Sequence, residues 1–68
     1  MKNYEVRIKN ADGVILSKEF IDLEAAITYY DGCIASLQFM VRDIYWYVYL
    51  IAVHSSVTLL SEEGNEEA

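Results

Sequence analysis

The longest apolar run of the chain is residues 44–53, IYWYVYLIAV, in which every position is apolar or aromatic. Successive side chains of a strand point to opposite faces of its sheet, so a strand with one solvated face alternates apolar and polar residues. The aromatic and β-branched composition of this run is typical of a strand. Because it does not alternate, we expect both of its faces to need cover.

The rest of the chain supplies about one helix, which can cover one face of this strand. One face carries Ile44, Trp46, Val48, Leu50 and Ala52, and the other carries Tyr45, Tyr47, Tyr49, Ile51 and Val53. We expect the Trp46 side to form the core, because an exposed tryptophan would be the costlier exposure. The tyrosine side is then the predicted protein-binding surface. The alternative is a second packed face, covered by the helix and the chain ends.

Residues 3–21 predict a β-hairpin, because apolar and charged residues alternate on both sides of a turn. A two-residue turn at 12–13 would set a lysine opposite a leucine and two cations opposite each other. A type I turn that begins at Asn10, with Gly13 as the bulge residue, collects the apolar side chains on one face. This register pairs Tyr4 with Phe20, Val6 with Lys18 and Ile8 with Leu16. The face expected to join the core is Tyr4, Val6, Ile8, Val14, Leu16 and Phe20.

The next segment predicts a helix of about five turns, with Asp22 as its N-cap and Glu24 in its first turn. Its apolar stripe has spacings of three and four: Leu23, Ile27, Tyr30, Ile34, Leu37, Val41 and Ile44. Asp31 and Gly32 interrupt the pattern, which leaves open a helix that ends or kinks there, with residues 38–41 joining a strand.

The remaining residues predict a turn at 54–56 and a short strand at 57–60. Residues 62–68 contain no large apolar residue to anchor them, so we expect a disordered acidic tail after a single domain at 1–61. The predicted fold is therefore α+β, in the order ββαββ, with an antiparallel sheet and one helix on one of its faces.

A chain of 68 residues buries too little surface to be more than marginally stable alone. The usual supplements are disulfides, a metal ion or association. One cysteine, Cys33, permits no internal disulfide, and with His54 it cannot complete a four-ligand zinc site. We therefore expect no metal and no cofactor, and we expect the chain to form a homodimer or to bind a partner.

The net charge of −6 comes mainly from one end of the chain, because residues 62–67 contain four glutamates. Residues 1–61 carry seven acids and five bases. The five scattered cations form no basic stripe, which argues against nucleic-acid binding. A nucleic-acid mimic would spread its carboxylates over the folded surface, and that role is disfavoured as well.

No residue pattern predicts catalysis. Cys33 and His54 could form a nucleophile–base pair, but a cysteine beside an apolar helix stripe is usually buried, and His54 closes a strand. The aspartates have local explanations as turn, cap, helix-face and helix-end residues. The three glycines belong to no phosphate-binding loop. We expect a protein that is not an enzyme.

A membrane span is a third possibility, because residues 44–60 form a stretch of 17 residues with little charge. This length is at the lower limit for a spanning helix, and the stretch contains His54 and two serines. The first seven residues carry charges where a secretory signal would be apolar. With a free cysteine, which suits a reducing compartment, these features favour a cytoplasmic protein.

The sequence thus predicts a small acidic module that associates with itself and covers a functional surface of a larger protein, as an inhibitor or modulator. Small phage-type regulators of host machinery share this size and composition, an analogy that no motif here supports. The alternative is a structural or assembly subunit whose homodimer is its purpose.

Overall fold

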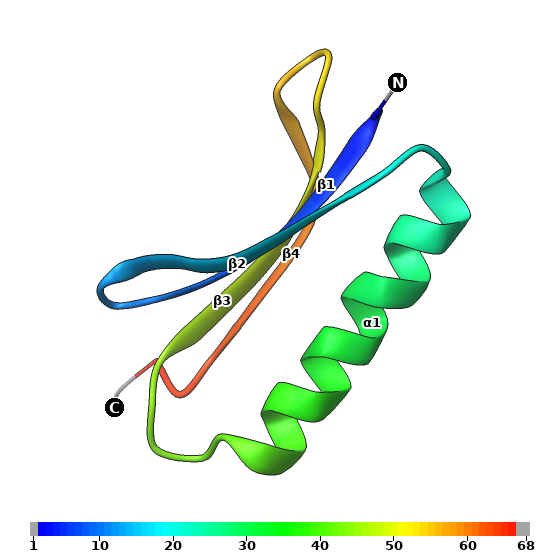
Figure 1. Ribbon diagram of the computed structural model, residues 1–68. Coiled ribbons are helices and arrows are strands. Elements are labelled where there is room, and N and C mark those ends of the chain that lie inside the picture. The colour runs from blue at the N-terminus through cyan, green and yellow to red at the C-terminus, as the bar shows by residue number, and fades with distance from the viewer. Residues whose placement is uncertain (1, 67–68) are drawn as a thin grey trace.

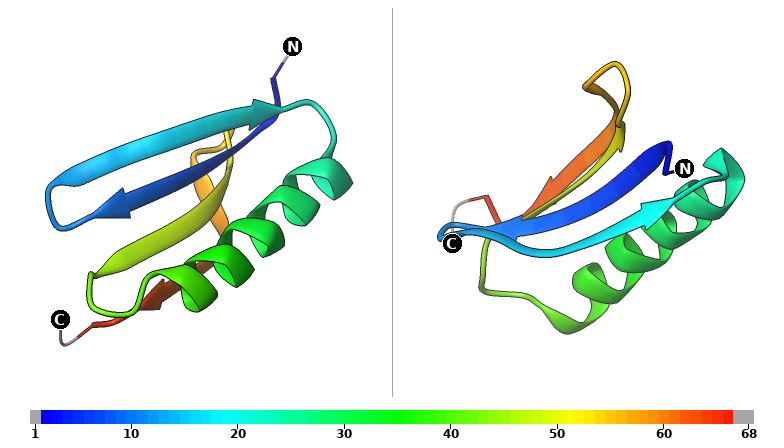
Figure 2. Two further views of the ribbon diagram at one scale, coloured as in Figure 1. Left: turned by 60° about the horizontal axis from the view of Figure 1, so that its bottom comes forward. Right: turned by 45° about the horizontal axis from the view of Figure 1, so that its top comes forward.

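Four antiparallel strands and one helix make up the computed structural model, which describes residues 2–66. The elements are β1 (Tyr4–Asn10), β2 (Gly13–Phe20), α1 (Leu23–Met40), β3 (Trp46–Ala52) and β4 (Val57–Gly64). The strands form one open sheet in the order β2-β1-β3-β4, and α1 lies along one face of it (Figures 1 and 2). The predicted ββαββ order and the α+β fold class are confirmed.

The β1–β2 hairpin has the predicted register from Tyr4 to Ile8, but its bulge lies at Ile15 and not at Gly13, because Lys9 pairs with Val14 and Asn10 with Gly13. Tyr4 pairs with Phe20, Val6 with Lys18 and Ile8 with Leu16, and an irregularity follows Ile8. In the turn, the backbone N–H of Asp12 donates to Asn10 Oδ1 at 2.8 Å, and Gly13 adopts a φ of 127°. The short polar side chain and the glycine therefore fix the tight turn between the two strands.

Helix α1 runs without a break from Leu23 to Met40 and passes through Gly32. Asp22 occupies the N-cap position, where its carbonyl accepts a hydrogen bond from the N–H of Ala26 at 3.1 Å. Its side chain makes no capping hydrogen bond. The helix ends before Ile44. The prediction that this residue belongs to the buried stripe is wrong, because Ile44 is 63% exposed. The chain must leave the helix axis there in order to return to β3.

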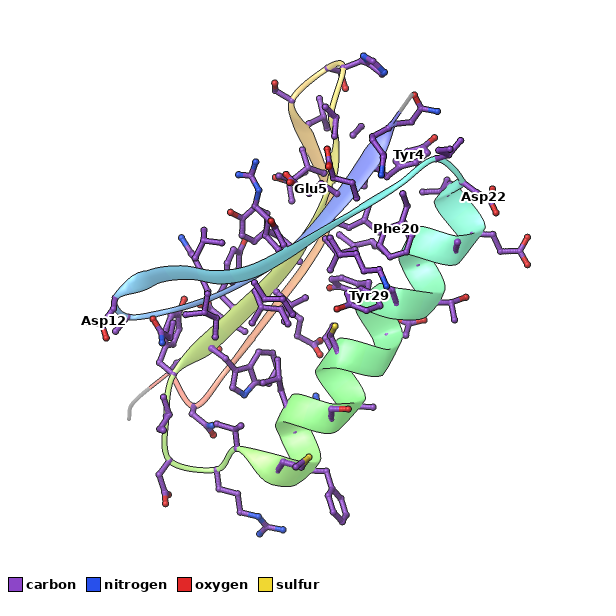
Figure 3. All side chains as sticks on the ribbon, in the orientation of Figure 1. Tyr4, Glu5, Asp12, Phe20, Asp22 and Tyr29 are labelled. Atoms are coloured by element: carbon purple, nitrogen blue, oxygen red, sulfur yellow. The ribbon has the colours of Figure 1, made fainter. Side chains whose placement is uncertain are left out.

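The core lies between α1 and the two central strands. Its buried residues are Val6, Ile8, Ala26, Tyr30, Trp46, Val48 and Leu50. The side of β3 that carries Trp46 therefore faces the helix, as predicted. Phe20 and Tyr29, labelled in Figure 3, extend this packing to the β2–α1 corner, with ring centroids 5.3 Å apart.

The predicted core face of the hairpin is only partly buried. Val14 and Leu16 are 53% and 47% exposed. The bulge at Ile15 pairs Val14 with Lys9, whose side chain lies on the face away from α1. The β1–β2 turn, which follows the Ile8–Leu16 pair, projects beyond the helix (Figure 1). The prediction that these two residues join the core is therefore wrong, because the bulge turns Val14 to the other face and the helix does not cover the turn end of the hairpin.

Strand β4 is longer than predicted and continues to Gly64. Residues 62–64 therefore belong to the sheet and not to a disordered tail. Glu62 pairs with Val48 on the helix side, where Gln38 Nε2 donates to Glu62 Oε2 at 3.3 Å. An edge strand tolerates such charged residues, because backbone pairing with β3 holds it in place while the carboxylates reach solvent. The last two residues of the expected tail, 67–68, lie outside the described residues.

The two residues that follow Glu63, Gly64 and Asn65, anchor the end of β4 to the rest of the fold. Gly64 lies against the indole of Trp46, and a Cβ at this position would overlap the ring atoms Cζ2 and Cε2. Asn65 adopts a φ of 57° and its Nδ2 donates to the carbonyl oxygens of Val41 and Ile44, both at 3.0 Å. The α1–β3 connection is thus held by the residue that follows β4.

Gly64→Ala should lower stability, because the new Cβ would displace the buried Trp46 ring. We expect a loss of about 1–3 kcal/mol, as for other overpacked cores. Thermal unfolding followed by circular dichroism measures it. Gly32→Ala is the matched control: nothing lies within 4 Å of its Cβ position. In a helix that change should stabilise by up to about 1 kcal/mol. Equal effects of the two changes would contradict the contact with Trp46.

Deleting residues 62–68 should also destabilise the chain, because it removes the end of β4, Gly64 and Asn65. A loss of about 2 kcal/mol would lower the thermal midpoint by roughly 8–16 °C in a domain of this size. Thermal melts of the full and truncated chains test this. An unchanged midpoint would show that the end of β4 contributes nothing.

Candidate protein-binding face

The face of the sheet opposite α1 carries most of the residues predicted to bind protein. We call Tyr45, Tyr47, Tyr49, Ile51 and Val53 the tyrosine face. Tyr47, Tyr49 and Ile51 belong to β3 and alternate with its core residues, so α1 does not cover them. Tyr45 precedes β3 and lies beside them through its hydrogen bond with Glu63, whereas Val53 lies in the turn after β3 and is 38% exposed. The other four residues are half-buried.

Three cross-strand rows surround these side chains. Tyr47 lies between Lys9 of β1 and Glu63 of β4. In the next two rows, Tyr49 lies between Arg7 and Ser61, and Ile51 lies between Glu5 and Thr58. The rings of Tyr47 and Tyr49 are 5.2 Å apart. Side chains opposite each other on one face of a sheet are near neighbours, so β1 and β4 supply the flanks of the tyrosine face.

The flank from β1 is basic and contacts the aromatic rings. Lys9 Nζ lies 5.2 Å from the centroid of Tyr47 and 6.0 Å from that of Tyr49. The Arg7 guanidinium lies 6.0 Å from the Tyr49 centroid, and its Nε donates to Glu5 Oε1 at 2.6 Å. The charge of Arg7 is therefore paired, whereas Lys9 forms no ion pair within residues 2–66.

The flank from β4 is acidic. The hydroxyl of Tyr45 donates to Glu63 Oε2 at 2.8 Å, and this hydrogen bond raises the pKa of Tyr45. The hydrogen bond keeps the Glu63 carboxylate on the tyrosine face. The face has a positive side and a negative side, with the tyrosines between them.

These flanks change one expectation from the sequence. The charged ends of Arg7 and Lys9 lie over the rings and shield part of the aromatic surface, so the tyrosines do not depend wholly on outside cover. Sequence reasoning missed these two residues because they become neighbours of the tyrosines only through the β1–β3 register. Their alternation with Val6 and Ile8 in β1 was the available signal.

The residues considered for nucleophilic catalysis are not brought together. Cys33 lies on α1 near Tyr29 and Lys18. His54 lies in the β3–β4 turn, where its Nε2 is 3.0 Å from Asn3 Oδ1. No hydrogen bond joins Cys33 to His54 in the described part of the chain.

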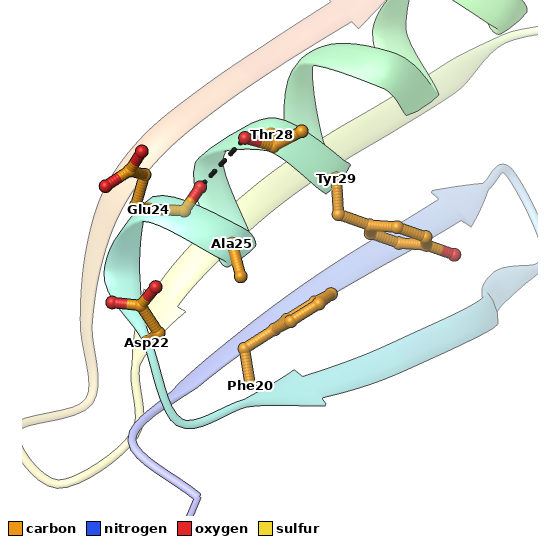
Figure 4. A pocket seen from close by; sticks show the side chains of 6 residues that line it. All are labelled: Phe20, Asp22, Glu24, Ala25, Thr28 and Tyr29. Atoms are coloured by element: carbon orange, nitrogen blue, oxygen red, sulfur yellow. Dashed lines mark hydrogen bonds between the residues drawn. The ribbon is translucent and has the colours of Figure 1, made fainter.

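The pocket at the β2–α1 corner, about 550 Å³, is lined in part by Phe20, Asp22, Glu24 and Tyr29. Figure 4 shows the two rings side by side and both carboxylates pointing away from them. Its dashed line marks the bond that Thr28 Oγ1 donates to the carbonyl oxygen of Glu24 at 3.0 Å. This contact lies within the helix, between a side chain and the backbone one turn earlier, and leaves the pocket without converging polar groups.

Two further searches of residues 2–66 gave no result. No cluster of three or more histidine, cysteine or acidic residues is placed to hold a metal ion among them. The same residues include no helix long and apolar enough to cross a membrane.

Cys33 should react slowly with alkylating reagents. Burial raises the pKa of its thiol, and the nearby Tyr29 hydroxyl and the charge of Lys18 offset this only in part. Less thiolate is then present at a given pH. The rate of iodoacetamide alkylation in the folded chain should fall below the rate in denaturant. A faster reaction in the folded chain would reveal an activated thiolate.

Comparisons with protein-family models, curated proteins and solved structures found no match to this chain, so the tyrosine face is interpreted from its own geometry.

Proposed function

We propose that this protein is a non-enzymatic protein-binding module that uses its tyrosine face. One observation carries the proposal. Three tyrosines occupy successive positions on the side of β3 that α1 leaves uncovered. Tyrosine offers a large, rigid contact area together with a hydroxyl group, and aromatic residues are enriched at the energetic centres of interfaces.

The surroundings of the tyrosines support this use. An apolar and aromatic centre bounded by charged residues resembles the core and rim of a protein interface. Lys9 and Arg7 bound it on one side, and Glu63 bounds it on the other. These charges would orient a partner more than they would add affinity.

The role proposed for this module is to associate with itself and to cover a functional surface of a larger protein, as an inhibitor or modulator. A reducing cytoplasm would suit its free Cys33. The second candidate is a structural subunit whose homodimer is its purpose. The opposite charges on the two flanks of one face favour this second candidate, because such a face can complement a copy of itself.

Tyr47→Lys should abolish capture of a larger partner. The new cation would lie at the centre of the face, beside Lys9, and would be costly to bury there. Tagged wild-type chain and the variant are compared in pull-downs from the native host, with proteins identified by mass spectrometry. Circular dichroism must show the same folded spectrum for both.

Ala35→Lys is the control, because it adds the same charge at an exposed position of α1. A partner that is lost with Tyr47→Lys and retained with Ala35→Lys supports the proposal. A partner retained by both variants would contradict it.

A further inference from the structure

The arrangement of charge on the tyrosine face selects one partner. We propose that a second copy of the chain packs on it, face to face, about a two-fold axis that runs parallel to β3. This inference rests on the proposed function, because it assigns an occupant to the same surface.

The charges that matter lie in one cross-strand row. Lys9 and Glu63 both lie opposite Tyr47, one from β1 and the other from β4. The cation and the anion are thus one strand away from β3, on opposite sides of it. Within the described residues Lys9 forms no ion pair, and Glu63 is held on the face by the hydroxyl of Tyr45 at 2.8 Å.

Rotation about a two-fold axis parallel to β3 leaves each cross-strand row at the same position along β3. It places β1 of one copy over β4 of the other. Lys9 of one copy then faces Glu63 of the second copy, and the reverse contact forms at the same time. Tyr47 and Tyr49 face their own counterparts near the axis. In the other two rows, Arg7 faces Ser61 and Glu5 faces Thr58, so no like charges meet.

The perpendicular choice of axis is disfavoured by the same charges. A two-fold axis perpendicular to the strands and level with the Tyr49 row would place β1 over β1 and reverse the order of the three rows. Arg7 would then face Arg7 of the second copy, and Lys9 would face a Glu5 that already accepts a bond from Arg7. Like charges opposed at an interface cost several kcal/mol. Of these two arrangements, both centred on the same three rows, only the one with the parallel axis avoids this penalty.

Sheet packing allows such a contact. Two stacked sheets lie about 10 Å apart, with strand directions within about 30° of each other. Tyrosine, lysine and glutamate side chains are long enough to meet across this gap. Because the second copy covers the same surface that a larger protein would bind, self-association and target binding compete. The homodimer is then a form of the protein with its binding face closed.

A charge exchange between copies tests the arrangement. Lys9→Glu and Glu63→Lys each replace two attractive contacts by two repulsive ones, and each should weaken self-association by about tenfold or more. An equimolar mixture of the two variants should restore it. In that heterodimer, the altered position 9 of one chain meets the altered position 63 of the other, and the one remaining contact, between Glu63 of the first chain and Lys9 of the second, is wild type.

Analytical ultracentrifugation over a concentration series gives the dissociation constants, and circular dichroism checks the fold of each variant. Lys2→Glu is the control, since it makes the same charge change at an exposed residue before β1. It should leave self-association unchanged. A wild-type chain that stays monomeric at high concentration, or a mixture that stays as weak as its components, would overturn the inference.

A second measurement applies if either charge variant fails to fold. In a Cys33→Ser background, Tyr49→Cys places a thiol near the axis, and a short bis-maleimide should link two copies. Ser36→Cys, on the exposed side of α1, should give no linked dimer. Equal linking at both positions would overturn the proposal.

The two proposals can fail separately. A monomeric chain that loses a larger partner with Tyr47→Lys keeps the proposed binding of a larger protein, and it removes this inference together with self-association. A chain in which Tyr47→Lys changes neither capture nor self-association removes both.

Discussion

The single helix can cover only one face of the sheet, whereas its central strand β3 is apolar on both faces. This constraint shapes the rest of the molecule. The helix takes the side with Trp46, Val48 and Leu50, which is buried almost completely. The other side is left to its neighbours in the sheet. Long charged side chains from β1 lie over the tyrosine rings, a solution that gives partial cover at little structural cost.

This solution links stability to binding. Rings that are partly covered by cationic side chains can be fully covered by another protein, with those side chains moved to the rim of the interface. The acidic flank from β4 makes the two sides of the tyrosine face differ in charge. A face with one positive and one negative side accepts a partner in few orientations, and this selectivity comes from the sheet order β2-β1-β3-β4 itself.

Local rules explain what could be predicted from the sequence. The hairpin register depends on residues 4–20 and on one turn, and the choice of the Trp46 side depends on the parity of a single strand. The rest depends on contacts distant in sequence. Asn65 holds the carbonyls of Val41 and Ile44, and it thereby helps to fix where the chain turns from α1 into β3.

The same limit applies to the candidate site. The five residues of the tyrosine face follow from alternation along β3, whereas its flanks depend on which strands pair with β3. Glu63 was expected in a tail because it follows no apolar pattern. Its place in the sheet comes from pairing with Tyr47, which no local feature of residues 62–64 indicates.

The contact between Gly64 and Trp46 makes tryptophan fluorescence a probe of the end of β4. Trp46 is the only tryptophan of the chain and is 4% exposed. Its indole rests against the end of the edge strand, on the helix side of the sheet. Release of that strand would admit water to the ring before the helix melts. Tryptophan fluorescence and the helical circular dichroism signal therefore follow two different events, fraying of one sheet edge and loss of the whole fold.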